Sequence, residues 1–210
     1  MTTKITEQTK QFWNELYTKR DQIWSGKPNL QLTRAARTIK PGTVLDLGCG
    51  EGGDAVWLAQ QGWHVIATDV SPVALERSRA FAAAHSQESN IEFQQHDFAV
   101  SFPAGTYDLV SAQFLQSPLE FQRTEVLQKA AAAVAVDGYL LIVEHGSAPS
   151  WSPHASMHFP SAQETFDSLE LDNAKWRIEL LDAPERPITG PSGEQATIKD
   201  NVIFARRLAQ

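Results

Sequence analysis

A short apolar strand that runs directly into a glycine-rich turn constrains the fold more than any other feature of the chain. Residues 43–47 read Thr-Val-Leu-Asp-Leu, and residues 55–59 are typical of a helix. The turn between them carries four glycines, namely Gly48, Gly50, Gly52 and Gly53. Glycine lacks Cβ and reaches positive φ, so this backbone can approach a bulky group closely. The following helix start leaves N–H groups without helical partners. The pattern predicts a nucleotide-like ligand at the edge of an α/β sheet.

The glycine spacing alone does not identify the ligand. Residues 48–53 match the dinucleotide pattern G-x-G-x-x-G, but Asp46 places a carboxylate in the same turn. A pyrophosphate would be repelled by that carboxylate, whereas the ammonium group of an amino acid would be attracted. The turn therefore favours a ligand with a cationic end and an uncharged linker, unless Asp46 is only a structural turn residue.

Two further acidic residues follow predicted strands. Asp69 ends the strand predicted at 63–69, where it could accept hydrogen bonds from a ribose diol or cap the helix that begins after Ser71. NAD and S-adenosylmethionine both carry such a diol, so Asp69 does not separate them. Asp97 follows the strand at 91–95, and it could accept from the exocyclic amine of adenine or cap a turn.

With these residues in place, the chain resembles the class I S-adenosylmethionine-dependent methyltransferases. Five segments match in the family's order and spacing: 44–53, 65–71, 95–98, 107–113 and 137–144. The runs at 12–17 and 24–29 resemble the small-molecule branch, which contains the tellurite-resistance, thiopurine and heterocyclic-toxin methyltransferases. The resemblance implies transfer of a methyl group from S-adenosylmethionine to an O, N, S or chalcogen atom of a small-molecule acceptor, by in-line displacement. The product would be S-adenosylhomocysteine.

The matching segments supply the residues that we expect to bind the cofactor: Asp46, Gly48, Cys49, Gly50, Asp69, Val70, Asp97, Phe98, Gln113 and Trp24. Val70 and Phe98 would sandwich the adenine ring or be plain core. Cys49 is most simply a small buried residue. Gln113 would open into the cleft after its strand, or belong to an ordinary strand-to-helix loop.

Three side chains are candidates for the catalytic step. His145 and His154 could act as a general base or orient the acceptor, and otherwise they are surface or hydrogen-bonded histidines. Tyr17 could form a lid with Trp24, because aromatic faces attract a cationic sulfonium, or it could pack as core. His154 and His158 have the spacing of two metal ligands on a helix, but prolines flank them and no cysteine is near, so no metal is expected.

Alternating strand and helix patterns predict an α/β fold with a Rossmann-like doubly wound sheet. The resemblance implies seven strands, mostly parallel with one antiparallel strand, and helices on both faces. We expect a helix at 124–136, a strand at 139–143, and a terminal antiparallel pair at 176–181 and 197–206 joined by a loop. Residues 1–40 would form a helical lid and substrate cap, and residues 41–210 a single cofactor-binding unit.

The amino-acid composition restricts the kinds of binding partner that we expect. The net charge of −7 argues against a nucleic-acid partner, because binding phosphates requires a basic face. Cys49 is the single cysteine, which fits a reducing compartment, and no apolar run approaches the length of a membrane span. We therefore expect a cytoplasmic protein, a monomer or homodimer, without membrane contact.

Two alternatives remain open. An NAD(P)-dependent oxidoreductase would share the glycines and Asp69. This interpretation gives Asp46 and Asp97 no role, and the chain is too short to include a sizeable separate substrate domain. A non-catalytic S-adenosylmethionine-binding protein would share the whole site yet transfer no methyl group.

Overall fold

A mixed sheet forms the centre of the computed structural model, which describes residues 2–209. Its strands are β1 (Thr43–Leu47), β2 (His64–Asp69), β3 (Ile91–Gln95), β4 (Tyr107–Gln113), β5 (Val134–His145), β6 (Trp176–Asp182), β7 (Glu185–Thr189) and β8 (Gln195–Arg207). They lie in the order β3-β2-β1-β4-β5-β8-β6, and β7 pairs with β8 outside this path. The neighbours from β3 to β5 are parallel, while β8 is antiparallel to both β5 and β6. The predicted doubly wound sheet with one reversed strand is confirmed.

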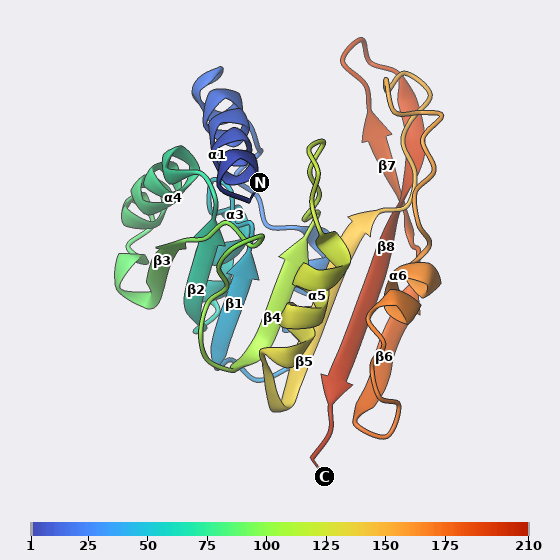
Figure 1. Ribbon diagram of the computed structural model, residues 1–210. Coiled ribbons are helices and arrows are strands. Elements are labelled where there is room, and N and C mark those ends of the chain that lie inside the picture. Colours follow the sequence, from blue (N-terminus) through green and yellow to red (C-terminus); the bar gives the residue numbers. More distant parts are fainter. Residues whose placement is uncertain (1, 210) are drawn as a thin grey trace.

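The strand order reverses between β1 and β4, since β2 and β3 lie on one side of this pair and β5 on the other. In open α/β sheets the ligand crevice lies at the carboxyl ends of the strands, at such a reversal. Figure 1 shows β1, β4 and β5 pointing toward one end of the molecule, where helix α1 and the β7–β8 hairpin also project.

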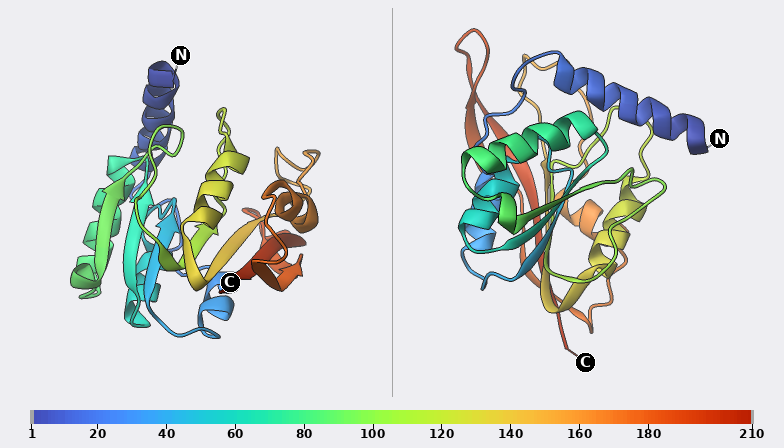
Figure 2. Two further views of the ribbon diagram at one scale, coloured as in Figure 1. Left: turned by 60° about the horizontal axis from the view of Figure 1, so that its bottom comes forward. Right: turned by 90° about the vertical axis from the view of Figure 1, so that its left-hand side faces the viewer.

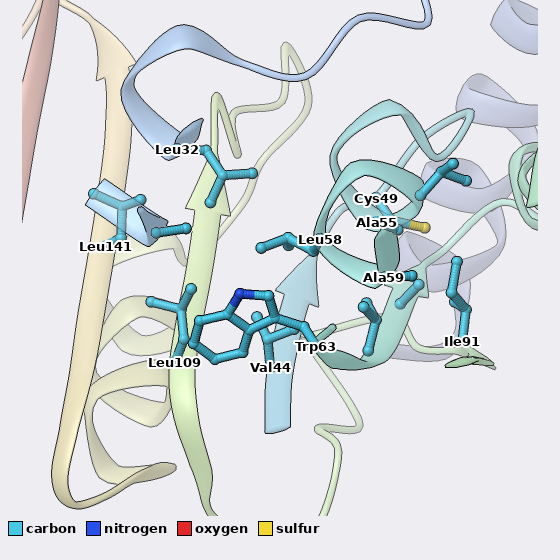
Figure 3. Packing of buried hydrophobic residues seen from close by; sticks show 14 of the residues in the cluster. Leu32, Val44, Cys49, Ala55, Leu58, Ala59, Trp63, Ile91, Leu109 and Leu141 are labelled. Atoms are coloured by element: carbon cyan, nitrogen blue, oxygen red, sulfur yellow. The ribbon is translucent and has the colours of Figure 1, made fainter. Parts of the chain in front are cut away.

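Helices cover both faces of the sheet, as predicted. They are α1 (Thr2–Thr18), α2 (Leu30–Ala36), α3 (Gly53–Gln60), α4 (Pro72–Ala84), α5 (Arg123–Ala132) and α6 (Ala162–Ser168), with one 3₁₀ turn at Glu88–Asn90. On one face Val44, Leu58, Trp63 and Leu109 pack together under α2 and α3 (Figure 3). On the other face a second buried cluster lies under α5 and α6. Alternate residues of β1 serve opposite clusters, because successive side chains of a strand point to opposite faces.

Helix α1 lies at the carboxyl end of the parallel strands and packs against α4 (Figure 2). The Ser71 hydroxyl caps α4 by accepting from the Ala74 N–H, and it donates to Asn14 Oδ1 of α1 at 2.6 Å. The N-terminal segment is therefore tied to the start of α4, beside the end of β2.

Two predicted boundaries are wrong. The helix expected at 124–136 ends at Ala132, and β5 begins at Val134 instead of 139. Val134 pairs with Tyr107 ahead of a register shift, and Asp137 has a φ of 65°, so an irregular strand replaces the last turn of the predicted helix. Sheet pairing and the β-branched valines here outweigh the helix propensity of the alanines.

The segment 182–196, expected to be a loop, contains the short strand β7. Its Pro187 pairs with Thr197 of β8. Proline cannot donate to a strand ladder, but it is tolerated on an edge strand whose outer side has no partner. The terminal strands thus form a longer hairpin than the sequence predicts.

Candidate functional site

The glycine turn after β1 brings backbone close to the N-terminal segment. The N–H groups of Gly48 and Cys49 both donate to the Thr68 carbonyl at 2.8 Å, which fixes the turn against β2. Gly50 has a φ of 54°, and a Cβ added there would lie 3.0 Å from Tyr17 Oη. A side chain at position 50 would thus be both strained and crowded.

Asp46 is a buried carboxylate with an unsatisfied oxygen. Its side chain is 1% exposed, and Oδ2 has no hydrogen-bond partner. Burial raises the pKa of Asp46 well above its usual range, and the negative charges of Asp54 and Asp69 raise it further. An unpaired acceptor in the field of two more carboxylates costs free energy, and a cationic group would relieve that cost.

Asp69 joins the glycine turn to the start of α4. Its Oδ2 accepts from the Gly50 N–H at 3.0 Å, and its Oδ1 accepts from the Ser71 N–H at 2.9 Å. Burial raises the pKa of Asp69 to about 6, although these hydrogen bonds oppose the shift. Each carboxylate oxygen can accept a second hydrogen bond, so both remain able to receive a diol.

Asp97 and Gln113 each hold another buried acceptor without a partner. Asp97 accepts from the Ala99 N–H at 3.0 Å through Oδ1, as a turn-capping residue would, while its Oδ2 is buried and unpaired. Gln113 ends β4 and donates to Ser111 Oγ at 3.1 Å, and its Oε1 is likewise unpaired. Together with Asp46, they place three unsatisfied acceptors at or near the carboxyl ends of β1, β3 and β4.

The remaining predicted lining residues differ in their surroundings. Phe98 is buried and packs 5.8 Å from Phe102 between ring centroids, so it belongs to the core under α5. Val70 is half-buried, and its carbonyl accepts from Gln95 Nε2 at 3.0 Å. Burial, followed by the charges of Asp69 and Asp46, raises the pKa of the Cys49 thiol well above its usual range, which keeps it protonated and unreactive.

Acidic residues of the turn also hold the segment that follows α1. Glu51 accepts from the Ile23 and Trp24 N–H groups, the latter at 2.8 Å, and forms an ion pair of 2.8 Å with Arg77. Asp54 accepts from both the backbone and the side-chain amide of Asn29 at 2.6 Å. Sequence reasoning missed both roles, although two carboxylates in a glycine turn without an assigned function were a usable signal.

Tyr17 and Trp24 meet over this turn. Tyr17 is 3% exposed, and its Oη accepts from Trp24 Nε1 at 3.4 Å, while Trp24 itself is 54% exposed. Burial and the charge of Asp69 raise the pKa of Tyr17. The phenol therefore stays protonated at neutral pH and can donate a hydrogen bond, but it cannot serve as a base.

The two candidate histidines, His145 and His154, lie in different surroundings. His145 ends β5, and its ring lies 4.5 Å from the ring of Phe114. Burial and, to a lesser degree, the charge of Arg186 lower the pKa of His145, against the opposing effect of Asp200, so its imidazole is neutral at pH 7. His154 is exposed in the loop between β5 and α6. A neutral imidazole can accept a proton, and of the two histidines His145 lies at a strand end beside the site.

Within residues 2–209 no group of three or more His, Cys, Asp or Glu side chains is arranged to hold a metal ion. Over the same residues, none of the helices is both long and apolar enough to cross a bilayer.

Comparison with known proteins gives a family match over the region just described. A family model for a methyltransferase domain matches residues 44–138. Among curated proteins, Hemagglutinin 1 of Eikenella corrodens is 26% identical over 165 residues, which cover 75% of this chain and 54% of that protein. The chain thus spans about half the length of this relative.

Solved structures share the fold. One, from work on the conversion of a disulfide bond into a thioacetal group during echinomycin biosynthesis, is 24% identical with a TM-score of 0.71, over 95% of this chain and 93% of the other. TehB from Haemophilus influenzae is 23% identical with a TM-score of 0.67, over 93% of this chain and 67% of the other.

Proposed function

From the class I, S-adenosylmethionine-dependent methyltransferase domain that the chain carries, we propose which residues bind the cofactor and which kind of acceptor is methylated. We propose that it transfers a methyl group from S-adenosylmethionine to an O, N, S or chalcogen atom of a small-molecule acceptor by in-line displacement. The fold similarity to TehB and to the echinomycin-related structure supports a small acceptor.

The unsatisfied acceptors match the donor groups of S-adenosylmethionine. The unpaired Oδ2 of Asp46 would receive the ammonium of the amino-acid tail, and Gly48 and Gly50 would let that tail approach the backbone. Asp69 would receive the ribose diol through the free lone pairs of its oxygens. The unpaired Oδ2 of Asp97 would receive the adenine amine.

The charge of the site also suits this ligand. Burial raises the pKa of Asp46, and Asp54 and Asp69 lie close enough for their charges to raise it further. S-adenosylmethionine brings an ammonium and a sulfonium, which would favour the ionised carboxylates. A dinucleotide would bring a pyrophosphate to the same turn, where these charges would oppose it. The single observation that carries the proposal is the buried, unpaired Oδ2 of Asp46.

When bound, S-adenosylmethionine supplies a methyl group that its positive sulfur already activates. The chain then has to align the acceptor and exclude water. Tyr17 and Trp24 cover the glycine turn, and residues 10–29 and 146–160 are the segments we propose as lids. His145 would take a proton from an acceptor that carries one, whereas a thiolate or another anion needs no base. The neutral, partly buried imidazole of His145 supports this role over the exposed His154.

We further propose that residues 1–40 act as a helical lid and substrate cap on the unit formed by residues 41–210. The hydrogen bonds from Ile23, Trp24 and Asn29 to the turn carboxylates support this division of roles. We also propose that the protein is cytoplasmic and is a monomer or a homodimer. The single buried thiol of Cys49 is consistent with a reducing compartment.

A thermal-shift comparison tests the proposal. S-adenosylhomocysteine at about 100 times its Kd should stabilise the protein by about 2.7 kcal/mol, while NAD and NADP should leave the melting temperature unchanged. Stabilisation by NAD or NADP alone would favour the oxidoreductase instead. A screen of phenols, thiols, hydroxyquinolines, selenite and tellurite for S-adenosylhomocysteine release would then separate an enzyme from a binding protein.

A further inference from the structure

A cavity of about 200 Å³ lies beside the proposed cofactor site, and its walls come from distant parts of the chain. The segment from Ser25 to Gln31 forms one wall, Phe114 and Val143 a second, and Arg186 and Asp200 of the β7–β8 hairpin a third. Pockets for drug-sized ligands usually measure roughly 300–1,000 Å³, so this one suits a molecule of one or two rings.

Asp200 is the buried charge of this cavity. Its side chain is 2% exposed, and its Oδ2 accepts from Arg186 Nε at 2.6 Å. Its other oxygen, Oδ1, is buried without a hydrogen-bond partner. A buried acceptor that lacks a donor costs free energy, and because Asp200 is among the residues that line the cavity, a donor group bound there would relieve that cost.

Three other charged or titratable groups bear on Asp200. Arg186 forms the ion pair with it, and His145 is its register partner across the β5–β8 ladder. Lys27 lines the opposite wall. The ion pair with Arg186 engages Oδ2 of Asp200 and leaves Oδ1 as the acceptor without a partner.

Phe114 supplies an aromatic wall in an unusual backbone conformation. Its φ is 52°, a left-handed value that is rare for a bulky residue, and its N–H donates to the Val143 carbonyl at 2.7 Å. Its ring lies against that of His145. Such strain persists where the surroundings impose it, often at functional sites, and here it accompanies a flat surface that suits a planar ligand.

The cavity adjoins the proposed cofactor residues along the chain at two places. Phe114 follows Gln113, and Ser25 follows Trp24, which meets Tyr17 over the glycine turn. A molecule in this cavity would therefore lie next to the groups that we assign to the methyl donor.

We propose that this cavity is the acceptor site, and that it selects planar molecules whose O–H or N–H group is received by Asp200 Oδ1. Asp200 is then a specificity residue that orients the acceptor, with Phe114 as the stacking surface. The inference rests on the proposed methyl transfer, which it deepens by naming the substrate class.

Phenol and anisole form a matched pair of probes, because anisole keeps the ring and lacks the donor. We would measure both affinities by ligand-detected NMR. Wild-type protein should bind phenol at least about fivefold more tightly than anisole, since anisole leaves the acceptor unpaired. Asp200→Asn should remove this preference, because the amide oxygen would turn to Arg186 and present its NH₂ group to the ligand. Asp182→Asn, at an exposed position of β6, is the control and should keep the preference.

Leu30→Trp provides a second variant that does not disturb the buried pair. Leu30 lines the cavity and is 48% exposed, so a larger side chain there should obstruct the cavity without disrupting the core. This variant should bind phenol at least about tenfold more weakly than wild type. It decides the question even if Asp200→Asn fails to fold.

The acceptor assignment is overturned if wild-type protein shows no saturable binding of phenol, binds phenol and anisole equally, or binds phenol unchanged in Leu30→Trp. S-adenosylhomocysteine affinity, measured by calorimetry on the same samples, keeps the two proposals apart. If wild-type protein does not bind S-adenosylhomocysteine, the methyl transfer itself is wrong. If it binds S-adenosylhomocysteine but shows no preference for phenol, only the acceptor site is wrong.

Discussion

The main-chain N–H of Gly50 donates to Oδ2 of Asp69 at 3.0 Å, which joins the turn after β1 to the end of β2. The same carboxylate accepts from Ser71 at the start of α4. The group that we assign to the ribose therefore also positions the glycine turn, so its protonation state should affect ligand binding directly.

The first prediction concerns pH. Burial raises the pKa of Asp69 to about 6, so this carboxyl is ionised above that pH and becomes neutral below it. An ionised carboxylate accepts hydrogen bonds more strongly than a neutral acid. The affinity for 5′-methylthioadenosine, which has the ribose but lacks the amino-acid tail, should fall by up to about tenfold one pH unit below this pKa. Calorimetry across this range measures the fall, and Asp69→Asn should flatten it. A level profile in wild-type protein would remove Asp69 as a ribose ligand.

The second prediction isolates Asp46. Asp46→Asn removes the charge that we assign to the ammonium of the amino-acid tail. The affinity for S-adenosylhomocysteine should fall at least about tenfold, near 1.4 kcal/mol. The affinity for 5′-methylthioadenosine should stay at the wild-type value, because this ligand has no ammonium. Equal losses for both ligands would indicate a general collapse of the turn instead of a lost contact.

The third prediction concerns the clamp on the N-terminal segment. Glu51→Gln removes the ion pair with Arg77 and weakens the hydrogen bonds from Ile23 and Trp24. Hydrogen bonds to charged groups contribute about 1.5–3 kcal/mol each, so amide exchange of Ile23 and Trp24 should quicken by at least about tenfold. Glu76→Gln, an exposed position on α4, is the matched control. Unchanged exchange in Glu51→Gln would mean that other contacts hold the segment.

The fourth prediction concerns crowding at Gly50. Gly50→Ala brings a methyl group to 3.0 Å from Tyr17 Oη at a φ of 54°. Gly193 has a φ of 89° with no atom within 4 Å of an added Cβ, so Gly193→Ala reports the backbone cost alone. We expect Gly193→Ala to cost about 1–2 kcal/mol of unfolding free energy and Gly50→Ala to cost more.

Adding Tyr17→Phe to Gly50→Ala should recover part of this difference. The two changes should then deviate from additivity by more than about 0.5 kcal/mol. Strictly additive denaturation data would show that Tyr17 does not press on the turn.

The sequence predicts the strands and helix starts that position the candidate site, because short-range patterns encode them. Asp46 lies one residue before the end of β1 and Asp69 ends β2, and parallel strands bring their carboxyl ends to one edge. Ser71 caps α4, and Ser161 forms a capping box with Glu164; both are local patterns, because each depends on residues only three positions apart.

What the sequence does not reveal depends on long-range contacts. Glu51 accepts a hydrogen bond from the Trp24 N–H, which lies 27 positions away in the sequence, and no local sequence pattern predicts this contact. Strand β5 begins at Val134 because Tyr107 is available to pair with it, which overrides the alanine-rich helix pattern. Asp200 becomes a buried cavity residue only because β8 folds back beside β5.

The most direct test of the account is a crystal structure of the protein with S-adenosylhomocysteine. We predict ligand density at the carboxyl ends of β1 and β2, with the ammonium within hydrogen-bonding distance of Asp46 Oδ2 and the ribose on Asp69. Density at another place, with this edge of the sheet empty, would contradict the account.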